Sequence, residues 1–383
     1  MEKADITEKR IKIGNISLLA AIIVLTIPEW NEYVWYEAVS PYGTLIALFF
    51  LAVTFVCYVR FGDAARDPYF WLAVCGCVVA AVNLVVIGSG KGAFLTAADV
   101  IIVIYLADKI RFSKPFLCFS CAYIGFYFFY WTFDVKGYFK GYNTNYGGLV
   151  LITGFVFAVT GLLAFRERLK ESEKKGAAFL SVFTVFCFAW AYNIVAWYRA
   201  RCALLGLVVF AVLMLIPLKV RKNRIFYTLL TLAMTIGAIG VSLLYVWLGK
   251  YASSFDVRIF YKDIISGRDE IWTDLWAAFL QHPLTGIGSS YKINVDWMGG
   301  MFEVHNGLLD ILIVHGIIVF AVTAFMLIQR LLLLREKAGE GAVSGAAVAG
   351  VFALLAASFM ENFFIVPPFL LCVLALIAIA RSV

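Results

Sequence analysis

The stretch NGLLDILIVHGIIVFAVTAFMLIQ, residues 306–329, decides the class of fold. One carboxylate and one histidine interrupt a sequence that is otherwise mostly apolar. A helix of about 20 apolar residues crosses the hydrocarbon core of a bilayer. Because lipid offers no partners to backbone N–H and C=O groups, a segment that crosses it in this way must be helical. The stretch therefore predicts a transmembrane helix.

Runs of the same kind recur along the whole chain, which is 63% hydrophobic and 16% aromatic, with a mean hydropathy of +0.90. We expect an all-α polytopic membrane protein in which residues 1–383 form a single integral membrane domain. No small-residue cleavage site follows the first run, so we expect that run to be retained as a span. About twelve transmembrane helices are predicted, at residues 13–29, 42–60, 69–88, 93–108, 115–133, 146–165, 177–197, 201–218, 225–248, 306–329, 342–360 and 363–380.

Lysine and arginine concentrate in alternate loops, and this asymmetry predicts the orientation. Twelve spans with both termini in the cytoplasm place every basic loop on the cytoplasmic side. We therefore interpret the net charge of +7 as a topology signal that gives no reason to expect nucleic-acid binding. The basic loops hold Lys3, Lys9, Arg10, Lys12, Arg60, Arg66, Lys109, Arg111, Lys114, Arg166, Arg168, Lys170, Lys174, Lys175, Lys219, Arg221, Lys222, Arg224, Arg330, Arg335, Lys337 and Arg381.

One loop on the predicted outer side, residues 249–305, is far longer than a usual connection. Its stretch ISGRDEIWTDL, residues 265–275, opens an amphipathic helix, because apolar residues then recur every four positions. Ser266 is the expected N-cap of this helix, and His282-Pro283 is its expected end.

Three arginines on the outer side are candidates for a site. Arg268 lies at the start of the loop helix, where a cation opposes the helix dipole, so either a bound anion or a salt bridge to Asp263 or Glu270 should compensate it. Arg199 and Arg201 flank the start of the eighth span. Each is either an anchor at the membrane edge or a functional residue.

A histidine and a carboxylate lie on the same side. His305 opens the tenth span and can exchange a proton near neutral pH, although it and Asn306 also suit a capping role. His315 is expected to be a hydrogen-bonded histidine within the bundle. Glu361, between the last two spans, would be costly to bury unless an arginine pairs with it. The histidines and the eight cysteines show no metal-ligand spacing, so we expect no metal and no cofactor.

Asparagines precede the sixth span in the stretch GYNTNYGG, residues 141–148. Asn143 and Asn145 suit either caps of that span or contacts to a polar ligand.

Several of these stretches match short motifs of one family. The matching stretches are Asn143-Thr144-Asn145, Arg201-Cys202-Ala203-Leu204-Leu205, Ser266-Gly267-Arg268 through Trp272, Pro283-Leu284-Thr285-Gly286-Ile287-Gly288, His305-Asn306-Gly307-Leu308-Leu309 and Glu361. In these motifs and in its topology the chain resembles the O-antigen ligase and O-antigen polymerase superfamily of bacterial envelope glycosyltransferases. One departure is Ala200, which stands where the family usually has a small polar residue before its arginine. Either Arg199 or Arg201 therefore remains a candidate for that arginine.

The resemblance implies an activity and a location. Members move a glycan from an undecaprenyl-diphosphate carrier onto an acceptor sugar, at the outer face of the bacterial cytoplasmic membrane, without nucleotide sugar or metal. Here it implies that His305 is the general base, and that Arg268, Arg201 or Arg199, Glu361, Asn306 and Asn145 bind substrate. The implied partners are the lipid-linked donor, a glycan or lipid-anchored acceptor and membrane lipid. A ligase (lipopolysaccharide) and a polymerase (capsular or O-antigen polysaccharide) remain equally compatible.

Two other classes share the twelve spans. A transporter or flippase for lipid-linked glycan would carry polar residues deep in many spans, whereas most spans here are plainly apolar. A non-catalytic scaffold explains the outer arginines poorly. The sequence therefore favours the enzyme.

Overall fold

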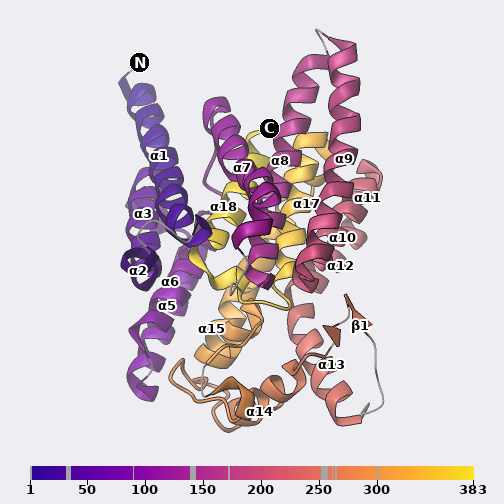
Figure 1. Cartoon of the computed structure of the whole chain (residues 1–383). Coiled ribbons are helices and arrows are strands. Elements are labelled where there is room, and N and C mark those ends of the chain that lie inside the picture. The colour runs from indigo at the N-terminus through magenta and orange to yellow at the C-terminus, as the bar shows by residue number, and fades with distance from the viewer. Residues whose placement is uncertain are drawn as a thin grey trace.

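The computed structural model describes residues 2–31, 36–88, 90–138, 144–170, 173–251, 258–260, 262–263, 265–299 and 302–383. They form a helical bundle with a short two-stranded ribbon and one helix across its lower end (Figure 1). The elements are α1 (Glu2–Asn31), α2 (Tyr36–Val39), η1 (Ser40–Tyr42), α3 (Gly43–Tyr58), α4 (Phe61–Ala64), α5 (Pro68–Ile87), α6 (Lys91–Leu106), α7 (Lys114–Tyr138), α8 (Thr144–Lys170), α9 (Lys174–Tyr198), α10 (Arg201–Leu215), α11 (Leu218–Arg221), α12 (Arg224–Thr235), α13 (Gly237–Tyr251), β1 (Arg258–Ile259), β2 (Lys262–Asp263), α14 (Arg268–Gln281), η2 (Asp296–Met298), α15 (Gly307–Leu332), α16 (Lys337–Glu340), α17 (Ala342–Ala357), η3 (Phe363–Ile365) and α18 (Pro367–Ser382).

Each predicted span coincides with one α-helix, except that the ninth coincides with two and the twelfth also includes η3 before α18. These two, α12 and α13, meet at a bend of 54°. Among the described residues, six helices are long and apolar enough to cross a membrane, or seven if α12 and α13 form one span. The helices α10, α17 and α18 are apolar but shorter. The fold is thus all-α, as predicted, and several of its helices are long and apolar enough to cross a membrane, whereas the count of twelve and the location of the termini stay predictions.

The centre of the bundle is formed by α17 and α18, in which nearly every residue is buried. The sequence of α17, AVSGAAVAGVFALLAA, has mostly small side chains, and α17 packs against α8 and α10 as well as α18. In lipid, helices gain little from apolar burial and associate through close contacts of this kind. The small residues therefore explain why α17 lies in the middle.

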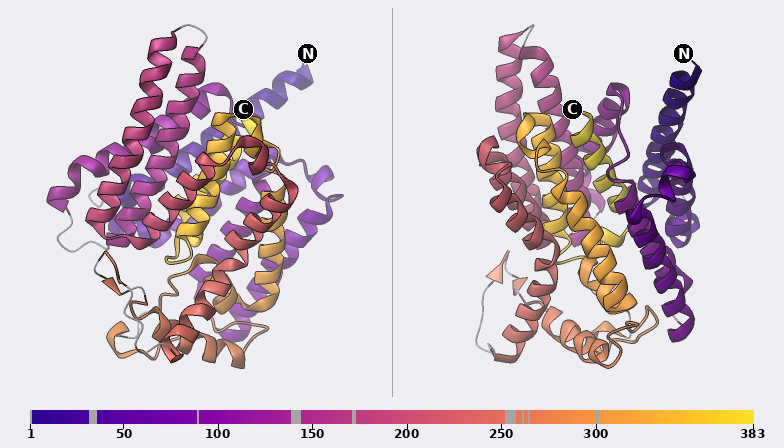
Figure 2. Two further views of the ribbon diagram at one scale, coloured as in Figure 1. Left: turned by 90° about the vertical axis from the view of Figure 1, so that its right-hand side faces the viewer. Right: turned by 180° about the vertical axis from the view of Figure 1, so that it is seen from behind.

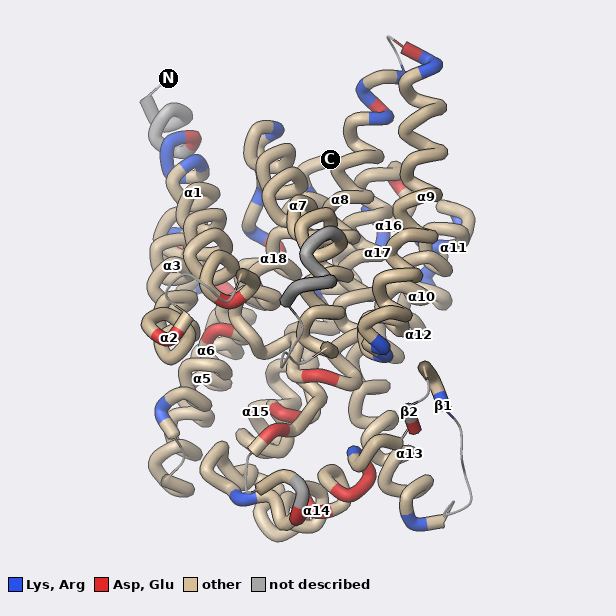
Figure 3. The backbone as a smooth tube through the Cα atoms, viewed as in Figure 1, with Lys and Arg blue, Asp and Glu red and all other residues tan. Residues whose placement is uncertain are grey.

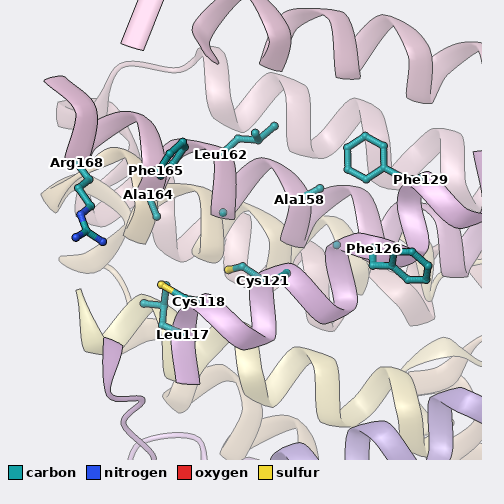
Figure 4. Close-up of a pocket in the computed structure, with 13 residues that line it drawn as sticks. Leu117, Cys118, Cys121, Phe126, Phe129, Ala158, Leu162, Ala164, Phe165 and Arg168 are labelled. Carbon is teal, nitrogen blue, oxygen red and sulfur yellow. The ribbon is translucent and has the colours of Figure 1, made fainter. Parts of the chain in front are cut away.

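An apolar groove of about 520 Å³ lies between α7 and α8 (Figure 4). Cys118 and Cys121 line it, as small apolar side chains of the kind the sequence predicts. Phe126 and Phe129 lie toward one end and Arg168 at the other (Figure 4). Because the walls are mostly apolar, the groove suits hydrocarbon.

The two ends of the bundle differ in charge. Lysine and arginine gather at the end that also carries the N-terminus, whereas α14 lies across the opposite end (Figures 2 and 3). We call the latter the α14 end. The charge asymmetry follows the predicted pattern, and the side of the membrane to which the α14 end belongs stays a prediction.

The helix α15 is broken at Gly316, whose backbone has φ 83° and ψ 172°. The turn after α14 fills the break: the amides of Ile287 and Gly288 donate to the carbonyls of Ile313 and Val314, at 2.9 and 3.1 Å. A Cβ atom on Gly286 (φ 74°) would lie 2.4 Å from the carbonyl oxygen of Val314, so this approach requires glycine. The carbonyl groups of Ile313 and Val314, which the break releases, are thus paired with the turn after α14.

The helix predicted from ISGRDEIWTDL is α14, and it ends at Gln281 with His282 as its C-cap, as predicted. Its buried side chains pack against α13 and α15. The prediction that Ser266 is the N-cap is wrong. The N-cap is Gly267, at φ 74°, and no side chain caps the helix. Ser266 itself has a left-handed backbone, with φ 53°, and its hydroxyl group accepts a hydrogen bond from Arg201.

Candidate active site

The polar cluster at the α14 end is centred on Glu361, in the turn between α17 and α18. This turn is fixed to the start of α15, because the amide of Gly307 donates to the carbonyl of Ser358 at 3.1 Å. A Cβ atom on Gly307 would lie 2.5 Å from Ser358 Oγ, so glycine is needed for the approach. The contact sets His305, two residues before Gly307, beside Glu361.

Both carboxylate oxygens of Glu361 are occupied. Oε1 accepts from Nη2 of Arg268 at 2.8 Å and from Nδ2 of Asn145 at 2.7 Å. Oε2 lies 3.3 Å from Nδ1 of His305. Only 6% of the Glu361 side chain is exposed, and a carboxylate so buried needs a counter-charge. Arg268 supplies it from 93 positions away in the chain.

Arg268 opens α14 and is itself buried. Its Nη2 makes both of its hydrogen bonds, to Glu361 and to the carbonyl of Met360 at 2.8 Å. The alternative that Arg268 pairs with Asp263 or Glu270 is therefore wrong. Its buried Nε has no partner among the described residues. A guanidinium has five N–H donors, and the two hydrogen bonds of Nη2 leave three of them without a partner among the described residues.

Arg201, the first residue of α10, reaches the segment that leads into α14. Its Nη2 donates to Ser266 Oγ at 2.8 Å, and its Nη1 donates to the carbonyl of Asp263. Burial of the Arg201 guanidinium and the positive charge of Arg268 both disfavour the charged form of Arg201. Arg199, by contrast, is the C-cap of α9 at φ 54°, and its side chain is exposed. The structure thus places Arg201 in the cluster.

His305 has a left-handed backbone, with φ 55°. A histidine in this region is strained, and such strain tends to occur at functional sites. The chain just before it is fixed, because the indole N–H of buried Trp272 donates to the carbonyl of Val304 at 2.7 Å. The imidazole Nδ1 lies 3.3 Å from both Glu361 Oε2 and Glu303 Oε1. Both carboxylates therefore orient the ring through Nδ1, and Nε2 is the nitrogen that does not contact them.

Asn306 was predicted to bind substrate, but its side chain is fully buried. It is the N-cap of α15: Oδ1 accepts from the amide of Leu309 at 3.0 Å, and Nδ2 donates to the carbonyl of Ala238 at 2.9 Å. Its own amide donates to Oδ1 of Asn362. The prediction is corrected to a positioning role, since Asn306 joins the segment after His305 to the turn that carries Glu361.

Asn145 lies in the first turn of α8 and reaches Glu361, so it belongs to the cluster. Asn143, the other predicted asparagine, lies outside the described residues. His315, which lies beside the break in α15, is buried, and its carbonyl accepts from Nδ2 of Asn83 at 2.7 Å.

Glu303 also belongs to the cluster, although the sequence pattern did not single it out. Burial raises the pKa of its carboxyl group; the charge of Glu361 adds to the rise, and His305 and Arg268 oppose it. Ligand atoms of Glu303, His305 and Glu361 lie within 4.8 Å of one another, so they could hold a cation. However, Glu361 already accepts from Arg268, whose positive charge would repel a metal ion at this place.

The fold and the cluster around Glu361 together define a class of protein. It is a helical membrane protein in which two arginines and a histidine–carboxylate pair lie at one end of the bundle. Residues 186–324, less than half of the chain, match the family model described as O-antigen ligase (Wzy_C). The predicted resemblance to the O-antigen ligase superfamily is thereby confirmed, and this family indicates a glycosyl-transferring enzyme. No curated protein and no solved structure matches the chain.

The matched segment runs from α9 into α15. It includes Arg201, Arg268 and His305, whereas Asn145 and Glu361 lie outside it. The contacts of Glu361 therefore join the matched segment to parts of the chain on both sides of it.

Proposed function

We propose that the protein is an outer-face glycosyltransferase of the bacterial cytoplasmic membrane, of the O-antigen ligase or polysaccharide polymerase type. It would move a glycan from an undecaprenyl-diphosphate carrier onto a hydroxyl group of an acceptor sugar. The observation that carries the proposal is that Arg268 and His305 bind opposite oxygens of one buried carboxylate, Glu361. A cation for the leaving group and a base for the acceptor are thus held side by side.

The reaction has one bond to form and one to break. The acceptor oxygen attacks the anomeric carbon of the donor glycan, and the bond from that carbon to the diphosphate oxygen breaks. The acceptor proton passes to His305, and undecaprenyl diphosphate leaves with additional negative charge. A direct displacement of this kind inverts the anomeric centre.

The leaving diphosphate is assigned to Arg268, with Arg201 beside it. Burial and the charge of Arg268 both disfavour a charged Arg201, and a bound diphosphate would offset this cost. Stabilisation of charge that develops in the transition state is usually the largest catalytic contribution. Arg201 also ties Ser266 to α10, so it both attracts the anion and positions the segment that leads to Arg268.

The proton is assigned to Nε2 of His305. A carboxylate next to Nδ1 favours the tautomer with hydrogen on Nδ1, which leaves the lone pair on Nε2. It also stabilises the imidazolium that forms once the proton has been taken. In this scheme Glu361 acts through both neighbours, on His305 as the orienting group and on Arg268 as the counter-ion.

The concentration of basic residues at the opposite end of the bundle supports the outer-side placement in this proposal. The scheme requires no metal, so chelation of divalent cations should leave activity unchanged. Loss of activity with a chelator, restored by Mg²⁺ or Ca²⁺, would overturn that part of the proposal.

The test uses purified protein with the lipid-linked donor, an acceptor glycan and three matched substitutions, Arg268→Lys, Arg201→Lys and Arg199→Lys. A lysine cannot reproduce the planar fork of an arginine. We expect Arg268→Lys to lower kcat about 100-fold, the usual scale for one lost oxyanion donor. Arg201→Lys should be intermediate, and Arg199→Lys should match the wild type.

Wild-type turnover by Arg268→Lys would count against direct contact with the diphosphate. In a strain that lacks the gene, His305→Ala should abolish surface polysaccharide while the protein stays in the membrane. If instead the purified protein moves lipid-linked glycan across vesicles and transfers no sugar, the flippase alternative is correct.

A further inference from the structure

A second polar pocket, of about 510 Å³, lies between α14, the turn after it and the end of α5. This volume is in the range of pockets that bind small molecules. Its polar side chains are Asp274, Gln281, His282, Thr285 and Tyr291, and its apolar wall is formed by Val86, Ile87, Ala277, Ala278 and Ile287. None of these residues belongs to the cluster around Glu361.

The pocket uses a different face of α14 from the one that packs on the bundle. Arg268, Trp272 and Leu275 are buried, whereas Asp274 and Gln281 face the pocket. Along a helix, six residues span about 9 Å and thirteen span about 20 Å. The pocket therefore begins about 9 Å along α14 from Arg268 and extends to about 20 Å.

The pocket is preformed. Oδ2 of Asp274 accepts from the hydroxyl of Tyr291 and from the amide of Asn294, both at 3.0 Å. The turn that forms its floor is held by the backbone bonds of Ile287 and Gly288 to the break in α15. Rigid walls of this kind reduce the entropic cost of binding.

The lining chemistry selects the class of ligand. Among the described lining residues there is one carboxylate and no lysine or arginine, so a phosphate or another anion is disfavoured. A carboxylate, an amide, an imidazole and two hydroxyl groups offer both donors and acceptors, which matches the many hydroxyl groups of a neutral sugar. The tyrosine ring and the aliphatic wall suit the apolar face of a sugar ring.

We propose that this pocket is a second, non-catalytic glycan-binding site that holds sugars beyond the one that reacts. The glycan extends along α14 from the diphosphate at Arg268, or from the acceptor hydroxyl at His305, and its more distant sugars lie in the pocket. This inference rests on the proposed function, since it takes the glycan of that reaction as its ligand.

The test measures binding of the oligosaccharide released from the lipid carrier, free of lipid and phosphate, by titration calorimetry. This oligosaccharide carries no diphosphate leaving group, so the wild type binds it without turnover. Relative to the wild type, we expect about tenfold weaker binding for Gln281→Ala and Tyr291→Phe, which each lose hydrogen bonds to the ligand or to Asp274.

The matched control is Thr273→Ala, since Thr273 is an exposed polar residue of α14 that does not line the pocket. It should bind like the wild type. Unchanged affinity in both Gln281→Ala and Tyr291→Phe would overturn the proposal, as would an equal loss in Thr273→Ala.

Two further measurements identify the source of the glycan. In the transfer assay, the pocket substitutions raise the KM for the donor if the donor glycan occupies the pocket, and the KM for the acceptor if the acceptor does. No change in either KM would also count against the site. Failure of the proposed function has a different signature, because the wild type would then bind the oligosaccharide and transfer no sugar.

Discussion

Two carboxylates lie at the same distance, 3.3 Å, from Nδ1 of His305. We expect the more buried of the two to contribute more to the rate of transfer. The side chain of Glu361 is 6% exposed and that of Glu303 is 43% exposed. At 3.3 Å, a unit charge interacts with an imidazolium by about 5 kcal/mol at the effective dielectric constant of about 20 that suits partly buried groups. In water the same interaction energy is about 1 kcal/mol, and we use this value for the more exposed Glu303.

The perturbation is therefore the pair Glu361→Gln and Glu303→Gln, each of which removes a charge and keeps the shape. Since about 1.4 kcal/mol corresponds to a tenfold change in rate, Glu361→Gln should lower kcat about 10³-fold to 10⁴-fold and Glu303→Gln at most about tenfold. The glutamine amide also donates to Nδ1, which favours the tautomer that lacks a lone pair on Nε2.

The assay is single-turnover transfer from lipid-linked donor to acceptor, with the purified variants at matched concentrations. Thermal unfolding in detergent serves as the control for folding, because Glu361→Gln also leaves Arg268 buried without its counter-ion. The reasoning is refuted if Glu303→Gln loses more activity than Glu361→Gln, or if well-folded Glu361→Gln keeps more than about a tenth of the wild-type rate.

Three further predictions concern the residues around the imidazole. His305→Gly should be about 1 kcal/mol more stable to thermal unfolding than His305→Ala, because glycine accepts a positive φ, and both should be inactive; equal stability would contradict the strain. Trp272→Phe leaves the carbonyl of Val304 without its donor, so kcat should fall about tenfold with little change in KM, whereas an effect on KM alone would contradict a positioning role. Burial raises the pKa of Glu303 above its ordinary 4.5, so the folded state retains a proton that the unfolded chain releases, and stability falls as the pH rises through the raised pKa. The melting temperature of Glu303→Gln should therefore rise relative to that of the wild type as the pH increases above 4.5, and a constant difference would contradict this.

The sequence predicted the parts of this molecule that depend on local pattern. Hydropathy located the helices. The recurrence of apolar residues every four positions located α14 and its end at His282, because the residues of a buried helix face recur with that spacing. The need of Glu361 for an arginine also followed from charge and lipid alone.

The sequence could not predict which arginine pairs with Glu361, because Arg268 lies 93 positions away and only the packing of α14 on α15 brings them together. The prediction that Ser266 caps α14 was wrong for a related reason. The hydroxyl of Ser266 contacts Arg201, which lies 65 positions earlier in the chain. Ser266 and Gly267 both have a positive φ, and Ser266 does not cap the helix. Glu303 was missed because its role depends on the position of Glu361, which lies in another segment.

The break in α15 has a consequence for how this protein can be assembled or engineered. The segment that follows α14 supplies the backbone donors that the interrupted helix lacks, so the membrane part cannot complete its own hydrogen bonding without the loop. Residues 283–288 and 313–317 therefore depend on each other for their backbone hydrogen bonds. A chimaera that exchanges the loop between relatives would have to carry both stretches from the same parent, and a protease cut between them should weaken the bundle and the loop alike.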